Sequence, residues 1–177
     1  MQLIMNLNIK ILAISLFISA FASAQVGFEK TSVDGSGLVD FPSGTTKGII
    51  LPQVSNNTNM TTVAEGTFVF DGATSKVKYY NGTEWIELTG EAGSSRTLLA
   101  GGENSQSKGI IIGASDSPAE KGVLILESQD KAMILPKVID PATNVKSPSA
   151  GMMCYDPVAK LVCFYNGTSW AFWGNIE

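Results

Sequence analysis

Histidine is absent from this 177-residue chain, and cysteine occurs only twice. Without histidine, the Ser-His and Cys-His nucleophile systems of many hydrolases cannot be built. No acidic cluster stands at ligand spacing, and two cysteines alone do not make a metal site. The sequence therefore predicts no catalytic residues, no metal and no cofactor, and we expect that the protein is not an enzyme.

Charge is also scarce, since Asp, Glu, Lys and Arg together make up 16% of the residues, with 16 acidic against 12 basic side chains. A net negative charge argues against nucleic acid as a partner, because binding to phosphates needs a basic face. Gly, Ser, Thr and Asn are abundant instead. This composition is typical of an extracellular β protein with many turns.

A long hydrophobic run occurs only near the N-terminus, over residues 11–21. Lys10 precedes it, and Ala22-Ser23-Ala24 follows as a small-x-small cleavage site, so residues 1–24 are predicted to be a secretory signal peptide. A membrane anchor is the alternative, although a span needs roughly 20 apolar residues. We expect the mature chain, from Gln25, to be exported without a membrane span. Its predicted location is the periplasm, the outer membrane surface or the extracellular space.

The chain does contain an internal repeat. Residues 47–54 (KGIILPQV) return as residues 131–138 (KAMILPKV), and residues 79–85 (YYNGTEW) return as residues 164–170 (FYNGTSW). The offsets are 84 and 85 positions, which one inserted loop residue explains. A duplicated module of strands and turns indicates a structural or binding unit.

The repeat divides the mature chain into a first β repeat (25–89), a Gly/Ser-rich linker (90–107) and a second β repeat (108–177). The predicted fold is all-β: two tandem repeats, each with short strands and a three-stranded antiparallel meander. Alternating residues predict the first meander over 67–70, 76–80 and 84–88, and the second over 152–155, 161–165 and 170–173. Shorter strands are expected at 37–41, 48–51, 109–113, 122–126 and 133–135. Neither repeat contains a convincing helical stretch, and residues 55–64 and 140–150 are predicted loops.

Asn-Gly-Thr occurs at Asn81 and at Asn166, and Asn56 and Asn59 also begin Asn-x-Thr sequences. Such sequences accept glycans in a eukaryotic secretory pathway. Asn-Gly is equally the strongest signal for a tight two-residue turn, because both positions tolerate positive φ. The repetition favours the turn.

Aromatic side chains gather around this turn in both repeats. They could stack on sugar rings or on another protein, or they could pack across strands within each meander. Together with the two turn asparagines they form the predicted interaction surface: Tyr80, Asn81, Trp85, Tyr165, Asn166, Trp170 and Trp173.

The two cysteines, Cys154 and Cys163, lie on adjacent predicted strands of an exported chain, where oxidation is expected. Their counterparts in the first repeat are Val69 and Lys78, which the alternation places on one face of the hairpin. A cross-strand disulfide between them is therefore predicted. Free thiols and a bridge between chains are the alternatives.

Three segments of each copy follow one recognisable order. They are residues 43–52, 66–71 and 79–85 in the first copy, and residues 128–136, 151–156 and 164–170 in the second. This order resembles the β-rich repeat of secreted and surface proteins of Bacteroidota-type bacteria and of phage tail-fibre-like proteins. Gln53 departs from the pattern, which has a basic residue there. The resemblance implies a β-rich fibre or surface module that is oligomeric, with a trimer among the expected forms.

We therefore expect an exported, non-catalytic structural or interaction protein of the bacterial cell envelope or surface, in the form of a fibre-like oligomer. A carbohydrate-binding or adhesin module that uses the aromatic side chains is the alternative. The expected partners are identical chains, an envelope protein that holds the chain in the absence of its own anchor, or a glycan.

Overall fold

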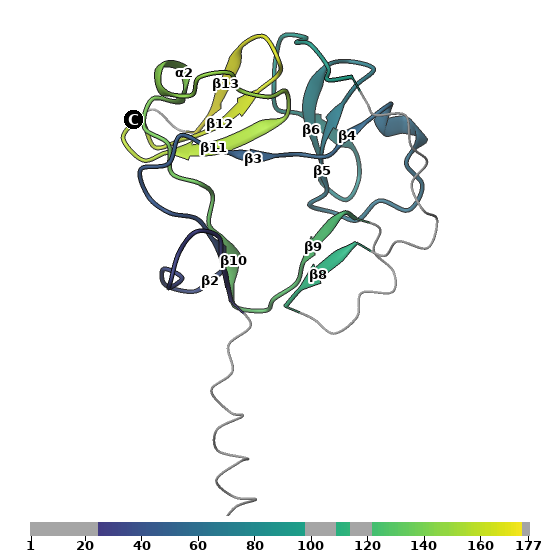
Figure 1. Cartoon of the computed structure of the whole chain (residues 1–177). Coiled ribbons are helices and arrows are strands. Elements are labelled where there is room, and N and C mark those ends of the chain that lie inside the picture. The colour runs from purple at the N-terminus through teal and green to yellow at the C-terminus, as the bar shows by residue number, and fades with distance from the viewer. Residues whose placement is uncertain (1–24, 98–108, 114–121, 175–177) are drawn as a thin grey trace, which may run out of the picture.

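The structure is a computed structural model that describes residues 25–97, 109–113 and 122–174 (Figure 1). The predicted signal peptide and part of the predicted linker, including Leu98 and Leu99, lie outside the described residues. The fold is all-β, as predicted: in the described ranges, short strands form four sheets. Among the described residues, no helix has the length and apolar character needed to cross a membrane.

The first meander consists of β5 (Phe68–Asp71), β6 (Lys76–Tyr80) and β7 (Trp85–Glu87). β4 (Gln53–Val54) joins it parallel to β5, which gives the order β4-β5-β6-β7. The register pairs Phe68 with Tyr79 and Phe70 with Val77. These four side chains share one face of the sheet, because successive residues of a strand point to opposite sides.

The second meander consists of β11 (Met152–Asp156), β12 (Leu161–Tyr165) and β13 (Trp170–Trp173). Its fourth strand is β3 (Ile49–Ile50), which comes from the first repeat and pairs antiparallel with β11. Gly48 permits this approach, since a Cβ there would lie 2.6 Å from the Cγ of Met152. The repeats thus share a sheet.

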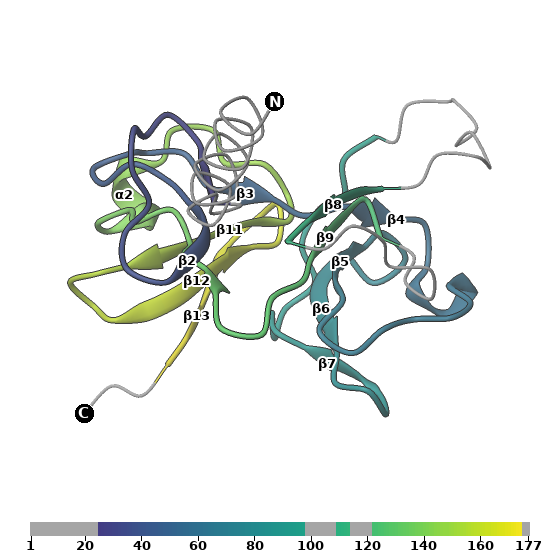
Figure 2. The ribbon, with the colours of Figure 1, turned by 90° about the horizontal axis from the view of Figure 1, so that it is seen from below.

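Two small parallel sheets complete the fold. One has the order β1-β2-β10 and combines β1 (Val26–Gly27) and β2 (Gly37–Asp40) with β10 (Ala132–Met133) of the second repeat. The other pairs β8 (Ile110–Ile112) with β9 (Leu124–Leu126). In Figures 1 and 2, β2 and β10 lie near the second meander, whereas β8 and β9 lie near the first. Each repeat therefore has its small sheet beside the other repeat's meander.

The main core lies between the two meanders and takes side chains from both. Its buried members are Leu51, Phe70, Val77, Leu88, Ala150, Met153 and Phe164. Met133 and Leu135 pack against it from the second repeat's early strand. Burial of apolar area is the main stabilising contribution to folding, so the repeats complete one core together.

A second apolar cluster lies on the opposite face of the second meander. Its buried members are Val138, Val145, Met152, Cys154, Leu161 and Cys163. Val138 and Val145 flank α2 (Pro141–Asn144), a four-residue helix in a segment that the sequence predicts to be a loop. Proline is well suited to the first position of a helix, because its fixed φ is a helical one. The N–H that proline lacks would have no partner within the helix at that position. Likewise η1 (Asn57–Asn59) forms within the predicted loop 55–64, where the side chain of Asn56 accepts a hydrogen bond from the Thr58 N–H.

Candidate interaction surfaces

The aromatic residues of the two Asn-Gly turns pack across the strands that the turns connect. Tyr80 is paired with Trp85 on β6 and β7, and their ring centroids lie 5.4 Å apart. Tyr165 and Trp170 repeat the arrangement on β12 and β13 at 5.3 Å. All four side chains are half-buried. Each pair therefore stabilises its own hairpin and stays partly exposed to solvent.

The asparagine of each turn closes it. The Oδ1 atom of Asn81 accepts hydrogen bonds from the N–H groups of Thr83 and Glu84, both at 2.8 Å. The Oδ1 atom of Asn166 accepts from the N–H groups of Thr168 at 2.9 Å and Ser169 at 2.7 Å. Asparagine is common in turns because its side chain makes such local bonds.

The two turns differ in what covers them. Asn166 is buried, and its Nδ2 donates to the carbonyl oxygen of Glu91 at 2.9 Å. Its own carbonyl oxygen accepts from the Ser94 N–H at 2.9 Å, so residues 91–94 of the linker lie over the second turn. Gly93 makes this contact possible, since a Cβ there would lie 1.8 Å from the carbonyl oxygen of Asn166. Asn81, by contrast, is exposed.

Trp173 lies at the end of β13, an edge strand of its sheet, and is 47% exposed. Phe172 beside it is 48% exposed. Across the strands, Trp173 is paired with Val162 of β12, and Phe172 is paired with Cys163. Trp173 is therefore the most exposed of the predicted aromatic residues.

Cys154 and Cys163 are directly opposite each other in the register of β11 and β12, and both are fully buried free thiols. A hydrogen bond with Cys163, together with burial, raises the pKa of the Cys154 thiol. The raised pKa keeps Cys154 in the protonated form, which is a poor nucleophile. The predicted disulfide is not formed in the structure and stays a prediction.

A buried ion pair occupies the corresponding face of the first meander. Lys78 Nζ lies 2.9 Å from Asp71 Oδ2 and 3.2 Å from Asn57 Oδ1. The Thr74 hydroxyl also donates to Asp71 Oδ2, at 2.7 Å. Burial raises the pKa of Asp71, but the hydrogen bonds from Thr74, Lys78 and Ala73 outweigh it and hold the pKa below its usual value. None of the residues in this cluster is a predicted site residue; the signal for it in the sequence is a lysine between the alternating apolar residues of β6.

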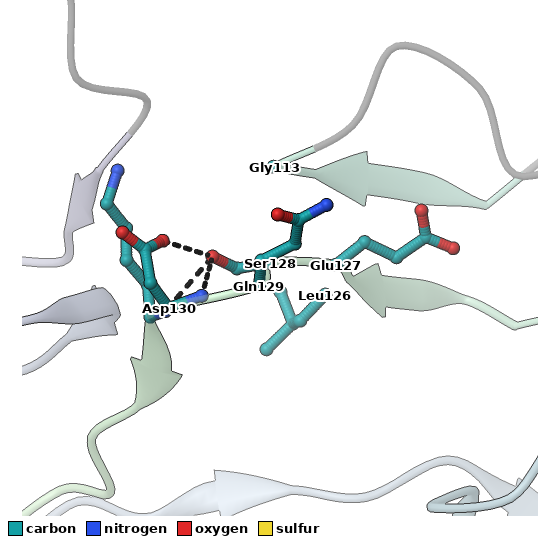
Figure 3. Close-up of a pocket in the computed structure, with 7 residues that line it drawn as sticks. Gly113, Leu126, Glu127, Ser128, Gln129 and Asp130 are labelled. Atoms are coloured by element: carbon teal, nitrogen blue, oxygen red, sulfur yellow. Dashed lines mark hydrogen bonds between the residues drawn. The ribbon is translucent and has the colours of Figure 1, made fainter.

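An open hollow of about 710 Å³ lies beyond the ends of β8 and β9 (Figure 3). Ser128 holds the backbone of the lining in place: the Ser128 hydroxyl oxygen accepts hydrogen bonds from the N–H groups of Asp130 at 3.3 Å and Lys131 at 3.0 Å. The hollow is lined by Gly113, Leu126, Glu127, Ser128, Gln129, Asp130 and Lys131. Within the described ranges, no group of three or more His, Cys, Asp or Glu side chains could hold a metal ion.

Several large apolar side chains of the short strands are exposed. Ile50 of β3 is 45% exposed, Ile110 of β8 is 66% exposed and Leu124 of β9 is 47% exposed. Val123, directly before β9, is 64% exposed. Apolar side chains gathered on one small sheet mark a contact surface more often than isolated ones do.

Comparison with known proteins gives one family. Residues 27–106 and 109–175 each match the family described as "Phage tail like trimerisation region". No curated protein and no solved structure gave a significant match. The two matched segments cover most of residues 25–177.

Proposed function

This chain belongs to the phage tail-like trimerisation family, and on that premise we propose that it is an exported structural subunit that forms a homotrimer at the bacterial cell envelope or surface. The observation that carries the proposal is the match of both sequence segments to a region whose described role is trimerisation. A tail-fibre-like, β-rich structural oligomer is the function that this match supports. It gives no support to a catalytic role.

The exposed strands fit this role. Small β modules bury little apolar area alone and commonly need a partner to complete their core. Ile110, Val123 and Leu124 remain exposed although they belong to or adjoin strands. Contact with identical chains would remove these side chains from water, which favours association.

The location is proposed from the sequence. The basic, apolar and small-residue segments of residues 1–24 support export, and the acidic net charge fits a protein that does not bind nucleic acid. Cell fractionation of the tagged full chain tests this point. Signal-peptide cleavage before Gln25 and recovery outside the cytoplasm would support it, and an uncleaved cytoplasmic chain would contradict it.

Light scattering coupled to size-exclusion chromatography tests the oligomeric state of residues 25–177. A molar mass three times that of one chain, kept on dilution, is the expected result. A monomer at every concentration would overturn the proposed trimer. The measurement is repeated with reductant, because a mass that falls on reduction would instead indicate a cysteine bridge between chains.

Glycan binding is the second candidate function. The specific observation in its favour is that Trp173 and Phe172 present about half of their surfaces to solvent at the edge of a sheet. Aromatic faces of this kind stack on sugar rings. A glycan array with the native chain and with Trp85→Ala, Trp170→Ala and Trp173→Ala tests it. Specific binding that is lost in the variants would support this function, and no binding would exclude it for the sugars tested.

A further inference from the structure

The first repeat's β2 is paired with β10, whereas its counterpart β9 has no such second neighbour among the described residues, and from this difference we infer that the outer edge of β9 binds the β3 strand of a second copy of the chain. The inference rests on the proposed trimer and specifies which backbone edges join its subunits. Equivalent residues of the two repeats have different strand partners.

The pairing of β1 with β2 in the first repeat is repeated by β8 and β9 in the second. The two strands run parallel in each sheet: Val26 is paired with Val39 in one, and Ile110 is paired with Leu124 in the other. Leu124 therefore holds the same place in its sheet as Val39 does in the other, as the paired residue on the second strand. β2 and β9 are therefore equivalent strands.

Their second edges differ. β2 is also paired with β10, and the Ile134 N–H donates to the carbonyl oxygen of Val39 at 2.8 Å. Among the described residues, β9 is paired with β8 alone. The bonds to β8 use Val123 and Glu127, through Ile110 N–H to Val123 O and Glu127 N–H to Ile112 O, both at 2.9 Å. Because alternate residues of a strand direct their backbone groups to opposite edges, those of Leu124 point to the outer edge.

The repeat also identifies the strand that fits this edge. The counterpart of Ile134, at the offset of 84, is Ile50 of β3. Leu51 N–H donates to Gly151 O and Met152 N–H donates to Ser149 O, both at 2.9 Å. Ile50 therefore directs its N–H away from β11, to the free side of β3. Its side chain is 45% exposed, and that of Leu124 is 47% exposed.

A second copy must supply this strand. β3 is held in the sheet of the second meander by its pairing with β11, and Figure 1 shows it among the upper sheets while β9 lies below them. The donor edge and the acceptor edge are thus on different parts of one molecule. A contact between two different surfaces of the same protein is heterologous. In an open row of copies, one β3 edge and one β9 edge stay unpaired at the two ends, whereas a closed ring of copies pairs every edge. Three copies that each donate β3 to the next satisfy all the edges.

Edge substitutions test the inference on the full mature chain. Leu124→Lys and Ile50→Lys place a charge on an exposed side chain of each edge, which opposes strand pairing. Val158→Lys is the matched control, because Val158 is 71% exposed on the turn between β11 and β12, away from both edges. We expect the first two variants to lose the trimer at concentrations where the native chain and the control keep it. Circular dichroism and thermal unfolding confirm that each variant is folded.

The outcomes separate this inference from the proposed function. If the native chain and both lysine variants are trimers, the inferred edge pairing is overturned and the proposed trimer is supported. A native monomer would overturn both. If the lysine variants fail to fold, crosslinking decides instead, since it requires no loss of assembly.

The register of β2 and β10 pairs Val39 with Met133, so the inferred interface pairs Leu124 with Ile49. A double variant, Ile49→Cys with Leu124→Cys, is expected to give covalent dimers and trimers with a short bismaleimide. Each single variant is expected to give monomers, and the native cysteines do not interfere because both are fully buried. Monomers from the double variant while its mass in solution is that of a trimer would overturn the inference.

Discussion

Cys154 and Cys163 face each other across β11 and β12, at the position that Val69 and Lys78 occupy in the first repeat. The same backbone arrangement thus carries a thiol pair in one meander and a lysine beside a valine in the other. In the first case the face is apolar and buried beneath Val138 and Val145. In the second, Lys78 brings Asp71 and Asn57 into a buried polar cluster.

The thiol pair leads to the first prediction. The proposed export would bring the chain into an oxidising compartment, where we expect Cys154 and Cys163 to form a disulfide. The bond makes the intact protein two hydrogens lighter than its reduced form. Such a bond closes a short loop and stabilises the folded state by about 2.5 kcal/mol in the chain-entropy account. Reductant should lower the free energy of unfolding by that amount.

Cys154→Val is the control for this prediction, because valine is the residue that the first repeat has at this place. Reductant should not change the stability of this variant. Identical masses for the native protein before and after reduction would show that the thiols stay free. Free thiols should still react with maleimide only after unfolding, because both are buried.

The second prediction concerns Asp71 and acid. The pKa of Asp71 is below its usual value in the folded protein, so the folded state binds the proton more weakly than the unfolded state. This carboxylate therefore contributes stability that is complete above the unfolded pKa of about 4 and is lost as the pH falls through the folded pKa. Asp71→Asn leaves Lys78 without its nearest counterion and should cost about 3 kcal/mol at pH 7.

Urea unfolding of the native chain and of Asp71→Asn at several pH values measures this effect. The difference in unfolding free energy should shrink as the pH falls from neutral towards 2. Glu84→Gln, on the exposed side of the first turn, serves as control and should follow the native curve. A difference that stays constant with pH would refute the role of the Asp71 charge.

The third prediction compares the two turn asparagines. Asn81→Ala removes the acceptor for two N–H groups at an exposed turn and should cost about 1 kcal/mol. Asn166→Ala removes the two corresponding bonds of the second turn and also the bond to Glu91, at a buried site. It should cost about 1–2 kcal/mol more, because buried polar groups left without partners cost more than exposed ones. Equal losses in urea unfolding would mean that the linker contact adds no stability.

The elements that a local pattern determines could be predicted from the sequence. β6 and β12 begin and end where the alternation of apolar residues placed them, and the register of Val69 with Lys78 follows from that alternation. Turn chemistry located the turns of both hairpins, and Asn81 and Asn166 each close their turn through the side chain. The predicted two-residue form was wrong: residues 81–84 and 166–169 make four-residue turns, in which only the glycine has a positive φ. These features depend on residues that are neighbours in the chain.

The exchange of strands between the repeats could not be predicted in this way. The pairings of β3 with β11 and of β10 with β2 join residues about a hundred positions apart. Two strands of two residues each carry no periodicity that specifies a partner. What decides these pairings is a tertiary fit, such as the close approach of Gly48 to Met152. The burial of Asn166 under the linker is of the same kind.

That linker contact gives the last prediction. Gly93 lies so close to Asn166 that an added Cβ would be 1.8 Å from its carbonyl oxygen, whereas a Cβ at Gly90 would meet nothing within 4 Å. Gly93→Ala should therefore force residues 91–94 off the second turn and cost about 1–3 kcal/mol, the usual cost of overpacking. Gly90→Ala is the matched control and should leave stability nearly unchanged. Limited proteolysis should cut Gly93→Ala within the linker faster than the native chain or the control. If both variants are cut and unfold alike, the linker does not depend on this contact for its place on the second turn.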